Sequence, residues 1–265
     1  CKSGNGGMPR ERRTVDMRRS MLFFPGNSAN MLLNADYLGS DSIILDLEDA
    51  VAQAEKDSAR ILVRNAILSL GFTKEVIVRI NPLDSPYWEK DLEQIIPAKP
   101  DMIMPTKVSG ADYVQTISKK IAQVEEKCGI EIGTVKLIPL IETALGVEKA
   151  FEIATADPRV KAIFLGGEDL TADMQCKRTK EGKEIFYARS RMVMAARAAG
   201  IDVYDTPWTD VEDYDGLIED AKFAAIEKGK AEGKGVVSLR GKMIDAPIVA
   251  RARQVLETAE AMGIR

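Results

Sequence analysis

Short apolar runs, each followed by a stretch with helical spacing, recur seven times along the chain and constrain its fold more than any other feature. The runs are almost wholly apolar, as expected of strands covered on both faces. Strands that alternate with helices in this way predict a parallel sheet wound in one sense. The predicted strands are Ser20–Phe24, Ser42–Leu47, Glu75–Ile80, Asp101–Pro105, Val135–Ile141, Ala162–Leu165 and Ile201–Tyr204.

The conspicuous polar residues come directly after these strands, which favours a (β/α)₈ barrel over an open sheet. A barrel gathers its chemistry at the C-terminal ends of its strands. A doubly wound sheet would carry a Gly-rich turn after its first strand, whereas the turn Pro25-Gly26-Asn27 supplies one glycine. The 265 residues suffice for one such domain. We therefore predict an α/β protein of the (β/α)₈ TIM-barrel class.

The C-terminal part of the chain does not complete this pattern. Where an eighth strand is expected, after Asp215–Lys222, the sequence reads FAAIEKGKAEGKG, which is charged and Gly-rich. Either the strand is absent or residues near Phe223–Ile226 are missing. A hairpin and a helix over about Ala246–Ala261 are predicted next, with Asp245 as N-cap. The expected parts are a flexible leader (1–17), a barrel (18–226) and a C-terminal lid or swapped arm (227–265).

The chain contains no histidine, which narrows its possible chemistry. Ser-His-Asp and Cys-His catalysis and His-ligated zinc are excluded, so a metal site would be built from oxygen, which favours Mg²⁺, Mn²⁺ or Ca²⁺. The net charge of −4, with basic residues scattered among acids, indicates no nucleic-acid-binding face. No apolar run approaches the ~20 residues that span a bilayer. The three cysteines are widely spaced, so the cytoplasm is the expected compartment.

Two predicted strands end in carboxylates. Val135–Ile141 leads to Glu142, and Ala162–Leu165 leads to Glu168 and Asp169. If these strands are parallel neighbours, Glu142 and Asp169 emerge side by side at one edge of the sheet. Mg²⁺ takes a few carboxylates and completes its shell with water and substrate oxygens. Helix capping or a surface ion pair would explain the same residues, and Glu168 could replace either ligand.

Other charged residues follow the neighbouring strands. Arg79 could fork onto a substrate carboxylate, or form an ion pair with Asp46 or Glu48. Lys107 could form a Schiff base if burial lowered its pKa, but beside a metal site an electrostatic role is favoured. The acidic group Asp46, Glu48 and Asp49 could orient Arg79 or metal-bound water, or could form a solvated turn.

Seven short motifs follow one another in the chain: SMLFFPGN (20–27), ILDLEDAV (44–51), VRIN (78–81), MPTKV (104–108), LIPLIETALGV (137–147), LGGEDLTAD (165–173) and DTPWTD (205–210). Together they resemble the citrate lyase β subunits, within the superfamily of citramalyl-CoA and malyl-CoA lyase-like enzymes. The resemblance runs from about Arg18 to the C-terminus, with a gap near Phe223–Ile226, where the family carries its eighth strand.

The resemblance implies a (β/α)₈ barrel, usually a trimer, with a Mg²⁺ site. Glu142 and Asp169 would be the metal ligands, and Arg79 would bind the carboxylate of the oxo-acid. The segment GKMID resembles a C-terminal lid that reaches into a neighbouring subunit, where Asp245 would act near the enolising acetyl group. The residues lining the mouth would be Pro25, Gly26, Asn27, Thr206, Pro207 and Trp208. Lys107, for which its position already favours an electrostatic role, is counted with them as a substrate-binding residue.

The expected reaction is a Mg²⁺-dependent retro-aldol cleavage of a citryl thioester, on an acyl-carrier protein, to oxaloacetate and an acetyl thioester. Candidates for its acid and base are Asp245 and the group Asp46, Glu48 and Asp49, with metal-bound water. Acyl-carrier-protein and acyl-transferase subunits would be partners. Two alternatives stay open. One is a stand-alone malyl-CoA or citramalyl-CoA lyase, which needs a pocket for CoA. The other is a non-catalytic scaffold barrel, favoured by the missing eighth strand.

Overall fold

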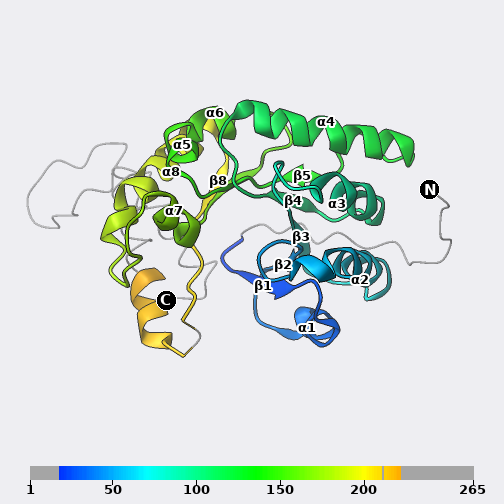
Figure 1. Cartoon of the computed structure of the whole chain (residues 1–265), viewed down its shortest axis with the longest axis horizontal. Helices are drawn as coiled ribbons and strands as arrows, with labels where there is room; N and C mark the ends of the chain where they lie inside the picture. The colour runs from blue at the N-terminus through cyan, green and yellow to red at the C-terminus, as the bar shows by residue number, and fades with distance from the viewer. Residues whose placement is uncertain (1–17, 211, 222–265) are drawn as a thin grey trace, which may run out of the picture. The chain divides into compact units, whose positions relative to one another are not determined.

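The computed structural model describes residues 18–210 and 212–221 (Figure 1). These residues belong to two compact units that divide after Pro207. The first unit is an α/β fold. The second is described from Trp208 to residue 221 and contains a helical segment over 214–221. The predicted leader, the lid with Asp245 and the gap near Phe223–Ile226 lie outside the described residues. Among the described residues, no helix is long and apolar enough to cross a membrane.

The strands of the first unit pair in sequence order, and every pair is parallel. This confirms the predicted parallel α/β organisation. One sheet has the order β1-β2-β3-β4-β5, and the second has the order β6-β7-β8. Their bounds are β1 Met21–Pro25, β2 Ser42–Asp46, β3 Glu75–Ile80, β4 Met102–Pro105, β5 Lys136–Leu137, β6 Leu140–Ile141, β7 Ala162–Leu165 and β8 Asp202–Tyr204.

The predicted fifth strand is divided into β5 and β6 at Pro139, which has no N–H to donate. Hydrogen bonding continues across the break. Leu137 bridges in parallel to Val160, and the carbonyl of Pro139 accepts the Phe164 N–H at 2.9 Å. The two sheets therefore follow one another without a change of strand direction.

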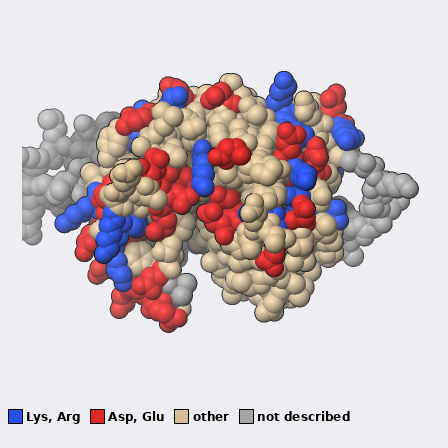
Figure 2. Space-filling model, in the orientation of Figure 1, with Lys and Arg blue, Asp and Glu red and all other residues tan. Residues whose placement is uncertain are grey.

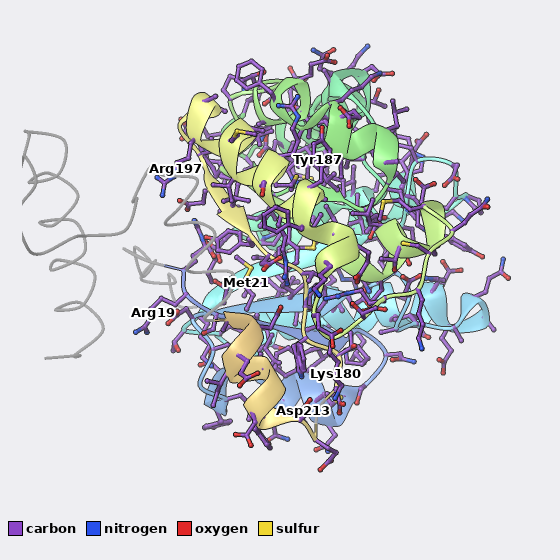
Figure 3. All side chains as sticks on the ribbon, turned by 90° about the vertical axis from the view of Figure 1, so that its left-hand side faces the viewer. Arg19, Met21, Lys180, Tyr187, Arg197 and Asp213 are labelled. Carbon is purple, nitrogen blue, oxygen red and sulfur yellow. The ribbon has the colours of Figure 1, made fainter. Side chains whose placement is uncertain are left out.

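Helices connect the strands, as the helical spacing predicted. The sequence has helical spacing over Lys56–Leu70 and Tyr113–Lys127, and the α2 and α4 helices match these ranges to within two residues. The α8 helix ends at Gly200, whose φ of 69° suits a residue without a Cβ. Tyr187 and Arg197 mark its two ends in Figure 3. The helices are α1 Ala29–Asn34, α2 Lys56–Ser69, α3 Trp88–Ile95, α4 Ala111–Lys127, α5 Ala144–Glu148, α6 Ala150–Ala154, α7 Gly167–Asp173 and α8 Phe186–Ala199.

Alternate strand residues face two separate apolar clusters, which explains why the runs are apolar throughout. One cluster packs the strands against the helices and includes Ile43, Val76 and Ile163. The other contains only strand residues or their direct neighbours: Ile44, Ile77, Met102, Met104, Ile138, Leu140, Ala162 and Phe164, with Met21, Phe23 and Tyr204 against them.

The strand-only cluster brings the first and last described strands together. The ring of Phe164 lies 6.2 Å from that of Phe23 and 6.1 Å from that of Tyr204, between ring centroids. The inner faces of β1, β7 and β8 therefore meet, as in a sheet that curves round on itself. Within the described ranges, β8 and β1 are not joined by a further strand that pairs with both.

Candidate active site

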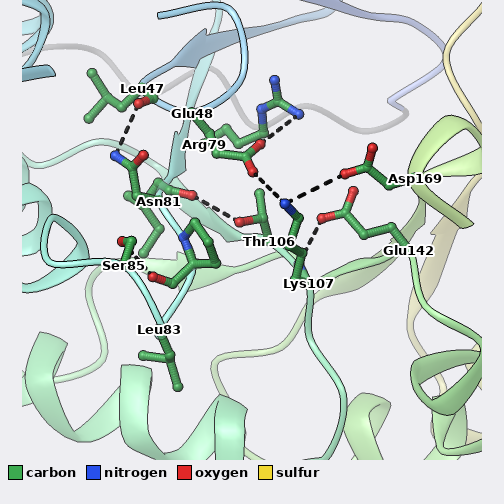
Figure 4. Close-up of polar contacts among 12 residues, drawn as sticks. Leu47, Glu48, Arg79, Asn81, Leu83, Ser85, Thr106, Lys107, Glu142 and Asp169 are labelled. Atoms are coloured by element: carbon green, nitrogen blue, oxygen red, sulfur yellow. Dashed lines mark hydrogen bonds and ion pairs between the residues drawn. The ribbon is translucent and has the colours of Figure 1, made fainter. Parts of the chain in front are cut away.

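The strand ends that were predicted to carry chemistry meet at one edge of the sheets (Figure 4). Arg79 lies near the end of β3, and Glu48 follows β2 by two residues. Lys107 follows β4 by two residues, Glu142 comes directly after β6, and Asp169 lies in the first turn of α7, the helix that follows β7. Because all these strands are parallel, their C-terminal ends share one edge, and the side chains point toward one another.

Lys107 contacts three carboxylates of this site. Its backbone N–H donates to Glu142 Oε1 at 2.7 Å. Its Nζ lies 3.6 Å from Glu48 Oε1 and 3.9 Å from Asp169 Oδ2. The side chains of Glu142 and Asp169, which the sequence placed on neighbouring strand ends, are therefore gathered around one residue.

Arg79 forms an ion pair with Asp46, one of the two acidic partners that the sequence analysis considered for it. Its Nε and Nη2 donate to Asp46 Oδ1 and Oδ2 at 2.7 and 2.6 Å, and its Cζ lies 5.0 Å from the centre of the Phe23 ring. Burial opposes the charge of Arg79, but the Asp46 hydrogen bonds and charge raise its pKa. Such a doubly held guanidinium is preorganised to bind an anion.

The three acidic candidates after β2 differ in their contacts. The oxygens of Asp46 also accept the N–H groups of Glu48 and Ala50, at 2.8 and 3.0 Å. Asp49 is exposed. Glu48 is buried, and its Oε2 lies 3.2 Å from Arg79 Nη1, in a geometry that makes no hydrogen bond. Asp46 thus orients Arg79, whereas Glu48 retains an oxygen that could accept a proton or a cation.

Two of the carboxyls are poorly compensated. The pKa of Glu142 is raised to about 8, chiefly by burial and then by the Glu48 carboxylate. The pKa of Glu48 is raised to about 7, chiefly by burial, against the lowering effects of Arg79 and Lys107. Figure 2 shows acidic side chains gathered near the middle of the face it presents. Buried carboxyls that lie next to one another and are only partly compensated favour binding of a cation.

Glycines after β7 make room for Glu142. A Cβ at Gly166 would lie 2.7 Å from Glu142 Oε2 and 2.8 Å from Glu142 Cβ, which no side chain tolerates. The N–H of Gly167 donates to Thr206 Oγ1 at 2.9 Å. Thr206, one of the predicted mouth residues, therefore supports the start of α7, the helix that carries Asp169.

A network that the sequence interpretation missed holds the turn after β2. The buried Lys56 donates from Nζ to the carbonyls of Leu47 and Glu48, at 2.9 and 2.7 Å. Asn81 Nδ2 donates to the Leu47 carbonyl at 3.0 Å and to Asp91 Oδ2 at 2.7 Å. A charged residue at a buried position of an amphipathic helix was the available signal for Lys56.

The other predicted mouth residues have local partners. In the turn after β1, the Gly26 N–H donates to the Asp46 carbonyl at 2.8 Å, and a Cβ at Gly26 would collide with that carbonyl. Asn27 Nδ2 donates to Glu55 Oε2 at 2.7 Å. Pro207 ends the first unit. Trp208 belongs to the second, where its Nε1 donates to the Asp210 carbonyl at 2.9 Å.

The carboxylates alone do not make a complete metal site. Over residues 18–210 and 212–221, no group of three or more His, Cys, Asp or Glu side chains is arranged to hold a metal ion. Glu142 and Asp169 would supply two ligands, and the others would come from water and substrate. That composition matches Mg²⁺, which usually keeps several waters.

The fold and the site define a class of protein: a parallel α/β protein with carboxylates, an arginine and a lysine gathered at its C-terminal strand ends. The sequence model of the HpcH/HpaI aldolase/citrate lyase family matches residues 19–234. The chain belongs to this family, and the resemblance stated from its motifs is confirmed.

Individual relatives cover between 78% and 95% of the chain. It is 38% identical to citrate lyase subunit beta of Haemophilus influenzae, over 95% of this chain and 99% of the relative. The citrate lyase beta subunit of Mycobacterium tuberculosis, solved with oxaloacetate and magnesium, is 30% identical, with a TM-score of 0.65 over 78% of this chain and 86% of that one. The protein CitE of the same organism, in complex with magnesium, acetoacetate and coenzyme A, is 26% identical, with a TM-score of 0.73 over 92% and 100%.

The Haemophilus influenzae alignment extends over 290 positions, more than the 265 residues of this chain. The relative therefore contains residues that have no counterpart here.

Proposed function

We propose that this chain is a Mg²⁺-dependent carbon–carbon lyase that cleaves a citryl thioester on an acyl-carrier protein to oxaloacetate and an acetyl thioester. The observation that carries the proposal is the meeting of Glu142, Asp169, Arg79 and Lys107 at one edge of the sheets. The relative from Haemophilus influenzae named citrate lyase subunit beta supports it, as does the Mycobacterium tuberculosis structure with oxaloacetate and magnesium.

The residues present fit a hard divalent cation. Glu142 is buried, with its pKa raised to about 8, and Glu48 Oε2 is buried without a hydrogen bond. Glu48 lies 3.2 Å from Arg79 Nη1 and 3.6 Å from Lys107 Nζ, but its raised pKa shows that these two charges compensate its burial only in part. Glu142 and Asp169 would hold the ion. When bound there, Mg²⁺ would act as a Lewis acid toward the hydroxyl and carboxylate of the substrate.

Arg79 would hold the carboxylate of the oxo-acid in register. Its contacts with Asp46 use Nε–H and one N–H of Nη2. The guanidinium keeps other donors, among them those of Nη1, which lies 3.2 Å from Glu48 Oε2 without a hydrogen bond. Because Asp46 and the Phe23 ring already fix the guanidinium plane, binding a carboxylate requires little reorganisation.

Glu48 is the proposed acceptor of the substrate hydroxyl proton. Asp46 is excluded from this role because its oxygens accept four hydrogen bonds. Glu48 lies in the same turn, and its Oε2 accepts none. Asp245 is proposed to return a proton to the acetyl enolate from the lid of a neighbouring subunit, on the resemblance alone.

The proposed architecture is a closed (β/α)₈ barrel. The strand-only apolar cluster supports it, and so does Arg18 at the opposite edge. Arg18 precedes β1, and its guanidinium donates to Glu75 Oε2 at 2.6 Å and to Asp202 Oδ2 at 3.1 Å. One residue thereby links the starts of β3 and β8, which fits strands arranged around a common axis.

The remaining expectations from the sequence belong to the same proposal. The barrel would extend over 18–226, after a leader (1–17) and before a lid (227–265). The assembly would be a homotrimer that works with acyl-carrier-protein and acyl-transferase subunits in the cytoplasm. Mixing Asp245→Ala and Arg79→Ala subunits tests the shared lid, because oligomers that contain both variants should recover part of the activity. Activity that stays at the level of the single variants would exclude sharing.

The metal assignment is tested by removing one ligand at a time. Glu142→Gln and Asp169→Asn should each lower Mg²⁺-dependent release of oxaloacetate from citryl thioester by about a hundredfold or more. Glu168→Gln is the matched control, because Glu168 adjoins Asp169 and is 52% exposed. Full activity in both ligand variants would refute the assignment of Glu142 and Asp169 as metal ligands. Loss of activity in Glu168→Gln alone would identify Glu168 as the ligand instead.

A stand-alone acyl-CoA lyase is the second candidate, since the CitE structure contains coenzyme A. The two candidates share the site and differ in the group that carries the thioester. Citryl thioester on the carrier protein, malyl-CoA and citramalyl-CoA should be compared side by side at equal concentration. We expect the carrier-protein substrate to give the highest kcat/KM; a CoA thioester in that place would establish the alternative.

A further inference from the structure

Lys107 adopts an uncommon backbone conformation at the centre of the candidate site. Its φ of 53° lies in the left-handed region, which residues other than glycine rarely adopt. In this conformation its N–H donates to Glu142 Oε1, and its Nζ lies near Glu48 and Asp169. Backbone and side chain of one residue therefore serve three carboxylates that come from different strand ends.

The side chain of Lys107 is held loosely, in contrast to that of Arg79. Its distances of 3.6 and 3.9 Å to the two carboxylates exceed hydrogen-bonding range, and the side chain is 42% exposed. Arg79 is 13% exposed and reaches Asp46 at 2.6 Å. A lysine carries a point charge on a flexible stem. The ammonium can therefore move while the backbone N–H stays on Glu142.

The position of this ammonium conflicts with a divalent cation. Both would lie near Asp169, and two positive charges at such short range repel. A lysine side chain with carboxylates at 3.6 and 3.9 Å is charged at neutral pH. It follows that the ammonium offsets the acidic cluster only while no divalent cation does so.

We propose that the Lys107 ammonium is a placeholder cation. It lies between Glu48 and Asp169 in the metal-free protein. When a divalent cation binds at Glu142 and Asp169, it turns away and binds an anionic oxygen of the substrate. The inference rests on the proposed function, because it needs both the cation and an anionic substrate. It assigns to Lys107 two consecutive roles with opposite effects on binding.

Those opposite effects make the inference testable without turnover. Mn²⁺ is the probe for the cation, titrated into full-length protein and followed by electron paramagnetic resonance. Lys107→Met should bind Mn²⁺ about tenfold more tightly than the unsubstituted protein, because the competing charge is gone. Oxalate is the probe for the anion, and its affinity for the Mn²⁺-loaded variant should fall about tenfold.

Two variants serve as controls. Lys99→Met removes another lysine with a left-handed backbone, φ 56°, which precedes β4 whereas Lys107 follows it. This variant should change neither affinity. Lys107→Arg keeps the charge and should keep the oxalate affinity within about threefold.

The possible outcomes are distinct. Tighter Mn²⁺ binding with weaker oxalate binding in Lys107→Met supports the inference. Weakening of both would make Lys107 a group that orients the carboxylates, and no change in either would leave it without a role; both results overturn the inference. If the unsubstituted protein does not bind Mn²⁺, or if Glu142→Gln binds it with unaltered affinity, the proposed metal site itself is refuted.

Discussion

The two ends of the chain segment 135–142 have buried glutamates in opposite electrostatic states. Near its start, Glu125 from α4 accepts hydrogen bonds from Arg159 Nη1 and Nη2, at 3.0 and 2.5 Å. It also accepts the N–H groups of Gly133 and Val135, each at 2.9 Å. Burial raises the pKa of Glu125, but these partners outweigh burial and lower it.

At the other end, Glu142 has similar solvent exposure and fewer partners. Its Oε1 accepts the Lys107 N–H, while the carboxylates of Glu48 and Asp169 lie close enough to raise its pKa further. Glu142 and Glu125 are 3% and 0% exposed, so solvent exposure does not separate them, although Glu142 is enclosed by more of the protein and its burial contributes to its raised pKa. The two also differ in pairing: Glu125 is bound by the guanidinium of Arg159, whereas the Glu142 carboxylate would be stabilised by a bound cation.

The largest effect is expected from breaking the compensated end. Glu125→Gln leaves the buried Arg159 without its anion and should lower the free energy of unfolding by about 3 to 5 kcal/mol. Urea denaturation followed by circular dichroism measures this. Mn²⁺ affinity of the folded variant should be unchanged, because Glu125 lies at the opposite end of the strand. A loss below about 1 kcal/mol would show that the pair is not a structural requirement.

The same substitution at the other end should have the opposite sign. Glu142→Gln replaces a carboxyl whose ionisation is disfavoured by burial, and its Oε1 can still accept the Lys107 N–H. In the presence of a chelator, the variant should be more stable by about 1 to 3 kcal/mol near neutral pH, while losing divalent-cation binding. Destabilisation comparable to that of Glu125→Gln would abolish the distinction between the two ends.

The pH dependence of stability should also differ in sign. The folded pKa of Glu142, about 8, lies above the ordinary glutamate value of 4.5, so the folded state binds the proton more tightly than the unfolded one. In chelator, this contribution falls as pH rises from about 4.5 to about 8, by at most ~1.4 kcal/mol per pH unit. The lowered pKa of Glu125 gives the reverse: its contribution is lost as pH falls below about 4.5.

Urea midpoints of the unsubstituted protein and of Glu142→Gln, measured in parallel across that range, check this dependence. The variant should show the shallower decline with rising pH. Identical slopes would mean that Glu142 does not titrate between the folded and unfolded states.

Most of the strands and site residues could be predicted because they depend on local pattern. A parallel sheet brings successive strand ends to one edge, so Arg79, Glu142 and Asp169 could be grouped without knowing any contact. The break at Pro139 also had a signal, because proline removes a ladder hydrogen bond. It went unused because the run Val135–Ile141 is otherwise continuous and apolar.

The supporting contacts could not be predicted, because they depend on tertiary packing. Lys56 and Arg60 face buried carbonyls and the carboxylate of Asp91, yet in the sequence they are ordinary helix residues. The left-handed conformation of Lys107 has no composition signal either, since glycine would be the expected residue there. Sequence pattern thus predicts which residues share an edge, and packing decides which of them are paired.

The smallest effect is expected from a third carboxylate, which is paired but near the surface. Asp41 accepts hydrogen bonds from the Arg19 guanidinium and backbone, and these lower its pKa to about 2. Because Arg19 is 53% exposed, solvent can replace either partner, and Asp41→Asn should cost about 0.2 to 1 kcal/mol in urea denaturation at neutral pH. If pairing alone set the energetics, this cost would equal that of Glu125→Gln. A cost severalfold smaller would show that burial makes the Glu125 pair indispensable, and that a buried position without a guanidinium leaves Glu142 dependent on a cation.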